Sequence, residues 1–362
     1  MKLQVTQANL SRALNSVARI ATNRGTLPIL ANVLLKTENN RLSIAATNLD
    51  IAITHFVGSK IEKEGAITVP ARLMQDFITN LPEGVINLEL EDNKLHITAE
   101  KYQSSINGIS AEDFPVMPAI DQTSSWKLPV SDFKKNLAKV VFAASNDDAR
   151  PVLTGVYFNT TEGAVAIATT DSYRLAEAKT AQTKNPVNFL MPASAAADLL
   201  RIISDTDKEV VVTHDEQQVL FEAGDVSLVA RLIEGNYPDY RKLIPTKFTT
   251  VAKLSRAEFL NIAKVSSLFA RESAGSITIN VQKEGKISIN AVASQIGENT
   301  ASADAKVTSD GEVTLNSRYL IEALGAFSSE EIEFCFNGKL EPCILRSKTE
   351  SSYVHLIMPL RS

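Results

Sequence analysis

Residues 9–18 read NLSRALNSVA, with apolar positions at helical spacing, and the pattern occurs twice more along the chain. Its counterparts are DFKKNLAKVV at 132–141 and EFLNIAKV at 258–265. With Leu10, Phe133 and Phe259 taken as equivalent, the steps between the copies are 123 and 126 residues. Self-similarity at a constant spacing is typical of a repeated architecture. This stretch therefore predicts a chain built from three similar parts.

Two further landmarks repeat in the same order. The first reads LSIAATN at 42–48, VAIATTD at 165–171 and ISINA at 287–291. The second reads VPARL at 69–73, MPASA at 191–195 and LNSRY at 315–319. Three landmarks at one period of about 120 residues are hard to produce by chance, and this period matches the common domain size. We therefore predict three domains, spanning residues 1–120, 126–246 and 247–362.

Each predicted domain shows the same order of elements. An amphipathic helix comes first, with apolar residues at i, i+4 and i+7, as in Leu10, Leu14 and Val17. Two alternating strands follow, such as 31–37 and 41–47, which a polar turn joins. A second helix and more alternating strands close each domain; the second helices are expected at 71–81, 193–203 and 317–327. This order predicts an α+β domain with two helices packed on one face of an antiparallel sheet.

The composition of the 362-residue chain is that of a globular protein, with 44% hydrophobic residues. No stretch approaches the roughly 20 apolar residues of a membrane helix. The first residues, MKLQV, begin like a strand and lack the apolar core of a signal peptide. We therefore expect no membrane association and a cytoplasmic location.

The cysteines and histidines suggest no metal site or cofactor. Cys335 and Cys343 both fall in strand-like segments, which favours reduced core thiols over the alternative of a disulfide. The four histidines are scattered without metal-ligand spacing, so we expect no structural metal. They are His55, His96, His214 and His355.

Three segments carry a resemblance to a known family. They read ATTDSYRLA at 168–176, NYPDYRKLIP at 236–245 and YVHLIMPLR at 353–361. These are similar to motifs of the bacterial DNA polymerase III β subunit, the sliding clamp, and the likeness covers the whole chain with its triplication. The resemblance implies a ring-shaped, head-to-tail homodimer of DNA-clamp domains, with sheets outside and helices lining a hole around duplex DNA. It implies a processivity factor without catalytic activity, which keeps the polymerase close so that rebinding becomes intramolecular.

The formal charge of −5 argues weakly against nucleic-acid binding, but binding depends on where the charges lie. Basic residues recur on the helices that the resemblance places inside the ring, whereas acids such as Glu89 and Glu331 lie on strands. Any one of these basic residues could belong to an ordinary solvated face, and their recurrence favours sequence-independent phosphate contacts. The predicted DNA-facing residues are Arg12, Arg19, Arg24, Arg72, Lys134, Lys135, Lys139, Arg201, Arg256, Lys264 and Arg318.

The C-terminus is apolar almost to its last residue. A final core strand explains Val354 and Leu356, but Pro359 cannot continue a sheet ladder. The resemblance implies a groove that binds short linear motifs of polymerases and repair proteins. Its residues are Arg150, Leu153, Thr170, Ser172, Tyr173, Arg174, Leu175, Pro238, Lys242, Leu243, Pro342, Met358, Pro359, Leu360 and Arg361. Ser172-Tyr173 and Lys242 depart from the common family pattern, which predicts an altered peptide preference.

The resemblance also implies a dimer interface between the first and third domains. It would join Ser104 and Ile106 on an edge strand to Leu268, Phe269 and Ile277 of a second copy. The expected partners are double-stranded DNA, a second copy of the chain, the DNA polymerase III catalytic subunit, the clamp loader, and other polymerases and repair proteins.

Two other functions compete with this interpretation. An enzyme could use residues 171–174 as a catalytic cluster, but no histidine lies nearby in sequence and no Gly-x-Ser-x-Gly or phosphate-binding loop occurs. A repeat scaffold could bind proteins without nucleic acid. Retention on circular DNA distinguishes the scaffold from a clamp.

Overall fold

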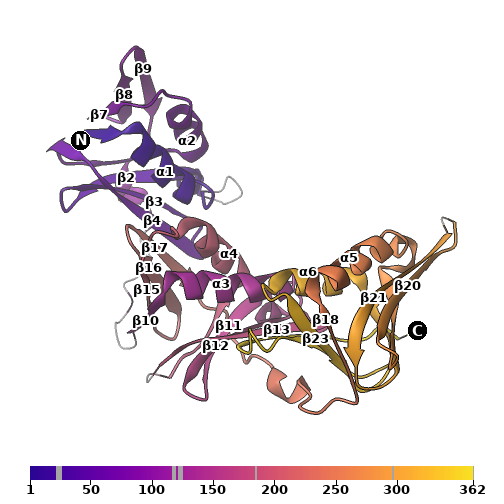
Figure 1. The fold of residues 1–362 in the computed structure, drawn as a ribbon. Helices are drawn as coiled ribbons and strands as arrows, with labels where there is room; N and C mark the ends of the chain where they lie inside the picture. Colours follow the sequence, from indigo (N-terminus) through magenta and orange to yellow (C-terminus); the bar gives the residue numbers. More distant parts are fainter. Residues whose placement is uncertain (22–26, 116–119, 121–124, 184–185, 296, 362) are drawn as a thin grey trace. The chain divides into compact units, whose positions relative to one another are not determined.

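The computed structural model describes residues 1–21, 27–115, 120, 125–183, 186–295 and 297–361 (Figure 1). The chain divides into two compact units. Unit 1 comprises residues 1–131 and 197–232, and unit 2 comprises residues 132–196 and 233–362. None of the helices in the described part of the chain has the length and apolar character that crossing a membrane requires.

The helices occur where the repeats predict them. They are α1 (Gln7–Val17), α2 (Ala71–Thr79), α3 (Val130–Val140), α4 (Ala193–Ile202), α5 (Arg256–Ser267) and α6 (Ser317–Ala326). The second helix of each repeat is therefore confirmed, although α2, α4 and α6 end one or two residues earlier than predicted. Side chains cap two helix starts: Ser255 accepts the Glu258 N–H at α5, and Asn316 accepts the Arg318 N–H at α6.

The described residues of unit 1 form two antiparallel sheets. The first has the order β5-β1-β7-β8-β9 and the second has the order β10-β15-β16-β17-β4-β3-β2-β6. Their strands are β1 (Lys2–Thr6), β2 (Asn32–Glu38), β3 (Arg41–Thr47), β4 (Ile51–Gly58), β5 (Lys60–Lys63), β6 (Ala66–Pro70), β7 (Val85–Glu91), β8 (Lys94–Ala99), β9 (Tyr102–Asn107), β10 (Ser125–Pro129), β15 (Glu209–His214), β16 (Gln218–Ala223) and β17 (Val226–Arg231).

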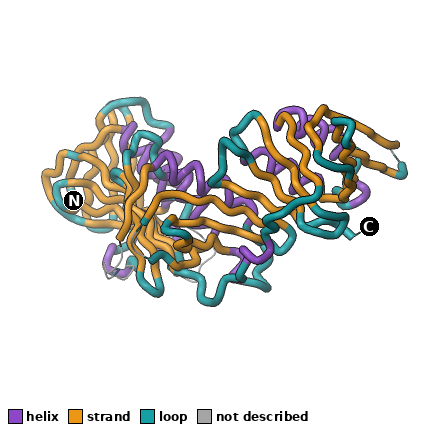
Figure 2. The backbone as a smooth tube through the Cα atoms, turned by 60° about the horizontal axis from the view of Figure 1, so that its bottom comes forward, coloured by secondary structure: helices purple, strands orange, loops and turns teal. Residues whose placement is uncertain are grey.

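In unit 2 the strands that the structure describes form one antiparallel sheet, in the order β14-β11-β12-β13-β25-β24-β23-β18-β21-β20-β19-β22. Its strands are β11 (Gly155–Thr161), β12 (Ala164–Thr170), β13 (Arg174–Gln182), β14 (Asn188–Pro192), β18 (Thr250–Ser255), β19 (Ser276–Gln282), β20 (Lys286–Ala293), β21 (Gly297–Val307), β22 (Gly311–Asn316), β23 (Glu331–Phe336), β24 (Cys343–Arg346) and β25 (Tyr353–Ile357). Figure 2 shows strands in orange and helices in purple.

Strand pairs join neighbouring repeats within each unit. In unit 1, β4 of the first repeat pairs with β17, so that Ile53 lies opposite Leu228. In unit 2, β13 pairs with β25 of the last repeat, so that Leu175 lies opposite Leu356. The sheets therefore run on from one repeat to the next. Because the compact units divide residues 126–246 between them, the predicted domain boundaries stay a prediction.

The first helix of a repeat covers one side of its sheet, as the apolar spacing predicts. Leu10, Leu14 and Val17 of α1 are fully buried, and α1 contacts β3, β4 and α2. In the third repeat α5 contacts β20, β21 and α6 (Figure 1). Phe259 on α5 is fully buried. Each such side chain contributes about 1.5–3 kcal/mol to folding through its burial. This packing confirms the predicted α+β class.

Two local features follow the sequence closely. The turn between β2 and β3 places Asn39 and Asn40 in the left-handed region, at φ 51° and 58°, which asparagine tolerates well. Cys335 and Cys343 are both free and buried, which confirms the prediction of reduced thiols. Burial raises the pKa of Cys335 to about 11 and also raises that of Cys343, so both thiols stay protonated at neutral pH.

Candidate functional site

The apolar C-terminal segment is bonded in place beside two strands. β25 pairs with β13 and with β24, and Ile357 lies opposite Arg174 and Cys343. Beyond the strand, the Met358 N–H donates to the Tyr173 carbonyl at 2.8 Å. The Leu360 N–H donates to the Thr314 carbonyl at the same distance. Residues 358–360 therefore form a half-exposed ledge that the main chain holds.

Met358 packs against an apolar cluster built from distant segments. The buried members of the cluster are Ala168, Leu175, Tyr240, Cys335, Ile344 and Leu356. Tyr237 and Ile244 are partly buried and also pack against it. The three motif segments, 168–176, 236–245 and 353–361, thus meet at one place in unit 2. Of the predicted groove residues, Leu175 is a buried member of this cluster and Met358 lies on the half-exposed ledge.

Large apolar side chains also stand exposed in the same unit. Tyr173 is 61% exposed and Leu243 is 54% exposed, both at predicted groove positions. Leu340 is 65% exposed and was not predicted. It lies two residues before half-buried Pro342, in the segment between β23 and β24. The first residue of β24, Cys343, lies opposite Ile357. A leucine flanked by Lys339 and Glu341 was the sequence signal available for it.

The other predicted groove residues differ in how far they are exposed to solvent. Pro238, Lys242 and Arg361 are exposed, whereas Leu153 and Thr170 are buried and Pro359 and Leu360 are half-buried. The Lys242 Nζ lies 2.7 Å from the Asp239 carboxylate on the same surface segment. Exposed pairs of this kind contribute little to stability, so Lys242 remains available to a ligand.

Arg174 holds the site together, because each of its three side-chain nitrogens donates a hydrogen bond to an acceptor within the chain. Its side chain is buried: Nε donates to Asp171 Oδ2 at 3.1 Å, Nη2 donates to the Phe142 carbonyl at 2.7 Å, and Nη1 bonds the Glu322 carboxylate. The guanidinium also stacks on the rings of Phe142 and Tyr319, 5.3 and 4.6 Å from their centroids. A buried cation requires such partners, because burying an unpaired charge is costly.

The turn before β13 is held by its own side chains. Asp171 Oδ1 accepts the N–H groups of Tyr173 and Arg174, both at 2.9 Å. Ser172 lies in the left-handed region at φ 78°, and its Oγ accepts a hydrogen bond from Arg150 Nη1 at 3.0 Å. The Ser172 hydroxyl therefore contacts a cation and no described base, which argues against the rival idea of a catalytic cluster at residues 171–174.

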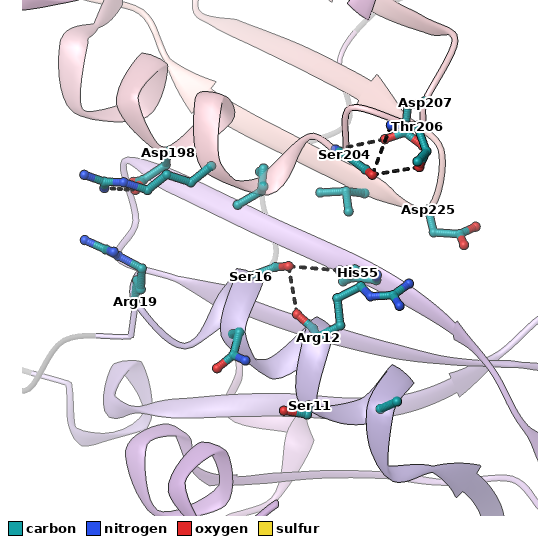
Figure 3. A pocket seen from close by; sticks show the side chains of 15 residues that line it. Ser11, Arg12, Ser16, Arg19, His55, Asp198, Ser204, Thr206, Asp207 and Asp225 are labelled. Atoms are coloured by element: carbon teal, nitrogen blue, oxygen red, sulfur yellow. Dashed lines mark hydrogen bonds and ion pairs between the residues drawn. The ribbon is translucent and has the colours of Figure 1, made fainter. Parts of the chain in front are cut away.

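A second surface lies in unit 1, around a cavity of about 890 Å³ between α1 and the end of α4 (Figure 3). Arg12 from α1, Arg19 from the turn after α1 and Arg201 from α4 line it, and all three are exposed. Asp198 holds Arg201 at 3.4 Å. Burial lowers the pKa of His55 in the same cavity, so this histidine is neutral at pH 7 and adds no charge. The three arginines are open to solvent, and Asp198, Asp207 and Asp225 line the same cavity.

Several predicted DNA-facing residues have other surroundings. Arg72, Lys135, Lys264 and Arg318 are exposed, whereas Lys134 is half-buried. The prediction was wrong for Lys139, which is 5% exposed and lies 3.0 Å from Glu350 with its Nζ over the Tyr353 ring. Arg256 is half-buried, and its Nε donates to the Ser329 carbonyl at 2.9 Å, so part of its guanidinium group is bound within the chain. Arg24 lies outside the described residues.

The predicted dimer-interface residues also differ in their exposure to solvent. Leu268 is 52% exposed, and Ser104 and Phe269 are half-buried. Ile106 and Ile277 are only 5% and 1% exposed, because both side chains face the interior of their own sheets. These two side chains therefore offer little surface to a second copy, and their assignment to a dimer interface stays a prediction.

Comparisons with known proteins agree over the whole chain. Family models of the DNA polymerase III beta subunit match its N-terminal domain at residues 1–118, its central domain at 127–239 and its C-terminal domain at 241–361. A "Beta sliding clamp" of Synechocystis sp. is 31% identical over 390 residues, covering 100% of this chain and 99% of the relative.

Solved structures are similar to the same extent. The DNA polymerase sliding clamp of Bacillus subtilis has a TM-score of 0.95 and 27% identity, covering 100% of this chain and 99% of the other. A sliding clamp of Bartonella birtlesii, solved bound to griselimycin, has a TM-score of 0.94 and 26% identity, with both chains covered completely.

The buried Lys139–Glu350 pair yields a prediction about stability. Lys139→Met leaves the Glu350 carboxylate buried without its cation, which costs about 3–5 kcal/mol of unfolding free energy. Lys135→Met is the matched control: Lys135 lies 4.0 Å from the same carboxylate but is 56% exposed, so its removal costs at most about 1 kcal/mol. Urea unfolding measures both. Equal costs for the two variants would contradict the assignment of Lys139 to the interior.

The same pair gives a pH dependence. Burial alone would raise the pKa of Glu350, but the bonds from Lys139 and from the Ser328 N–H outweigh it and lower the pKa below its usual 4.5. The stabilisation is therefore present above about pH 4.5 and is lost as the pH falls through the lowered pKa. Glu350→Gln should flatten this part of the stability profile.

Proposed function

The chain belongs to the DNA polymerase III β-subunit family, the beta sliding clamps, and on this premise we propose that it encircles duplex DNA and tethers replication proteins to it. The observation that carries the proposal is the match of three successive clamp-domain models along the full chain. The threefold repeat of the sequence supports it independently. On this proposal the protein catalyses no reaction and acts in the cytoplasm, where the replicating chromosome lies.

The proposed ring consists of two chains joined head to tail, each supplying domains at 1–120, 126–246 and 247–362. Two sheet edges support this. β9 pairs only with β8 among the described strands, so its other edge is open. β21 pairs with β20 along its length, but β18 covers only residues 305–307 of its second edge. Pairing β9 of one chain with residues 297–304 of the other removes both open edges.

Apolar side chains near these edges favour the same interface. Val265 and Leu268, at the end of α5, are 46% and 52% exposed, and α5 contacts β21. Tyr102 at the start of β9 is 49% exposed. The interface is therefore proposed to combine main-chain pairing with exposed α5 side chains, in place of the buried Ile106 and Ile277.

The DNA-binding surface is proposed to include Arg12, Arg19, Arg72, Lys135, Arg201 and Lys264, which the structure leaves exposed. Contacts from such side chains to phosphates carry no sequence information, which suits a ring that slides. The peptide groove is proposed to form around Met358 and the apolar cluster beneath it. Its ligands are short linear motifs of the polymerase III catalytic subunit, the clamp loader, and other polymerases and repair proteins.

Retention on circular DNA tests the main proposal. The protein is loaded onto nicked circular DNA with its clamp loader and ATP, and the DNA is then cut at one site. A clamp stays on the circle and slides off the linear product, because only topology retains it. A protein scaffold without affinity for nucleic acid shows no retention in either case, and that result would reject the proposal.

Deletion of Met358 to Ser362 tests the groove. We expect loss of polymerase binding and an unchanged dimer, because the ledge is removed while β9 and β21 remain. Surface plasmon resonance measures the binding, and light scattering measures the dimer. A monomeric product would contradict the assignment of this tail to ligand binding.

Combined neutralisation of Arg12, Arg19 and Arg201 to Gln tests the DNA-binding surface. Affinity for a short duplex should fall, and the slope of log K against log salt should become shallower by about 0.9 for each phosphate that the protein no longer neutralises. Lys348→Gln serves as the control, because this exposed lysine lies in the other unit near Glu333. An unchanged slope in the triple variant would remove these arginines from the DNA-binding surface.

A further inference from the structure

One residue of the cavity in unit 1 carries a charge opposite to that of the proposed DNA-binding surface. Asp198 lies on α4 and lines the cavity together with Arg201 of the same helix. The helix reads ASAAADLLRI, so Arg201 is its only cation and Asp198 its only anion. Figure 3 shows Asp198 and Arg19 at one end of the cavity. A carboxylate therefore lies beside arginines that are proposed to contact phosphates.

The two other aspartates of the cavity lie at its other end and are bound by other parts of the chain (Figure 3). Asp225 Oδ1 accepts a hydrogen bond from Arg41 at 2.6 Å. Asp207 Oδ2 accepts a main-chain N–H of the turn after α4 at 3.1 Å. Asp198 Oδ1, in contrast, lies 3.4 Å from Nη1 of Arg201. Of the three aspartates, Asp198 is thus the one that pairs with a proposed DNA-binding arginine.

The pair of Asp198 with Arg201 gives the fold little stability. Its distance of 3.4 Å exceeds the roughly 2.7–2.9 Å of a strong charge-assisted hydrogen bond. The Arg201 side chain is 53% exposed, and exposed pairs contribute little. The Asp198 side chain is only 15% exposed, and burial raises its pKa, although the nearby guanidinium groups of Arg201 and Arg19 act in the other direction. Because the folded pKa lies above the ordinary one, the ionised carboxylate lowers stability at neutral pH, and this cost disappears in acid.

Asp198 changes the charge that the cavity offers to a phosphate. Arg12 and Arg19 are exposed, and no ion pair between described residues includes them. Neutral pH lies about three units above the ordinary pKa of an aspartate, so Asp198 stays ionised beside Arg201. Its charge offsets that of Arg201 and repels a phosphate that approaches Arg19. The positive potential is therefore lower here than the three arginines alone would produce.

We propose that Asp198 limits the affinity of the ring for duplex DNA, so that phosphate contacts break readily and the ring slides. The inference rests on the proposed function and identifies a residue that sets how tightly the DNA is held. A ring that topology retains does not need tight binding. Each phosphate contact has to break before the ring can move along the duplex, and the strength of these contacts depends on the charge of the protein surface.

Asp198→Asn tests this role, because asparagine keeps the shape of the side chain and removes its charge. Anisotropy of a short fluorescent duplex measures the DNA affinity of the full-length protein across a salt series. The variant should bind about fivefold more tightly at low salt, as expected when one repulsive surface charge is removed. The slope of log K against log salt should become steeper, by about 0.9 if Arg201 then neutralises one further phosphate. Equal or weaker binding by the variant would overturn the proposal.

Glu162→Gln is the matched control for net charge. Glu162 is a carboxylate in unit 2 with a 77% exposed side chain, and it pairs with Lys179 at 2.7 Å. Its substitution changes the net charge by the same amount as Asp198→Asn, and the DNA affinity should stay that of the wild type. Tighter binding by both variants would attribute the effect to net charge and reject a specific role of Asp198.

Sliding is measured with rings loaded onto nicked circular DNA. After the circle is cut, the Asp198→Asn ring should leave the linear product more slowly than the wild type, because its phosphate contacts last longer. Equal rates would refute the link between Asp198 and sliding. Retention of the wild type on the closed circle, with no gain of affinity in the variant, rejects this inference alone. Absence of retention for the wild type rejects the proposed function as well.

Urea unfolding separates this role from a structural one. The Asp198→Asn protein should be at least as stable as the wild type at pH 7, because burial disfavours the ionised carboxylate in the folded state. A clearly less stable variant would assign the carboxylate to the fold and contradict the proposal.

Discussion

The pairing of β13 with β25 is the interaction on which the candidate groove depends. It joins a strand of the middle repeat to the last strand of the chain over five residue pairs, from Arg174 with Ile357 to Ala178 with Tyr353. Because the ladder ends at Arg174, the chain leaves β25 beside the turn that carries Tyr173. Met358 then bonds that turn and packs on the cluster around Leu175 and Leu356. A shift of one residue in the register between β13 and β25 would turn Leu356 to the opposite face of the sheet and remove it from the apolar cluster.

The buried guanidinium of Arg174 adds a second constraint. Its partners come from three parts of the chain: Asp171 in the turn, the Phe142 carbonyl after α3, and Glu322 on α6. A cation removed from water needs all of these acceptors, so the three segments are fixed relative to one another within unit 2. Arg150 and Arg318, by contrast, are exposed. The charge that builds the site and the charge that can meet a ligand are therefore carried by different residues.

Helical spacing did not distinguish cations that face solvent from those that the fold covers. Lys135 and Lys139 are four residues apart on α3 and share a face. The Lys135 side chain is nevertheless 56% exposed and the Lys139 side chain only 6%, because Glu350 from the segment before β25 covers the second position. Spacing along the sequence shows which residues share a face of one helix, but not which other segment covers that face. Here the covering residue, Glu350, lies more than 200 residues away in the sequence.

The sequence by itself determined the repeats, the order of helices and strands, and the apolar faces, since these depend on local periodicity and turn chemistry. It also located the three motif segments that meet at the candidate groove. Only the tertiary structure decided that Ile106 and Ile277 face the interior, that Lys139 is paired in the core, and that Leu340 is exposed. The physical reason is that burial and ion pairing depend on which distant segments come together. An alternating pattern predicts a strand, but it does not determine which other strands and segments pack against it.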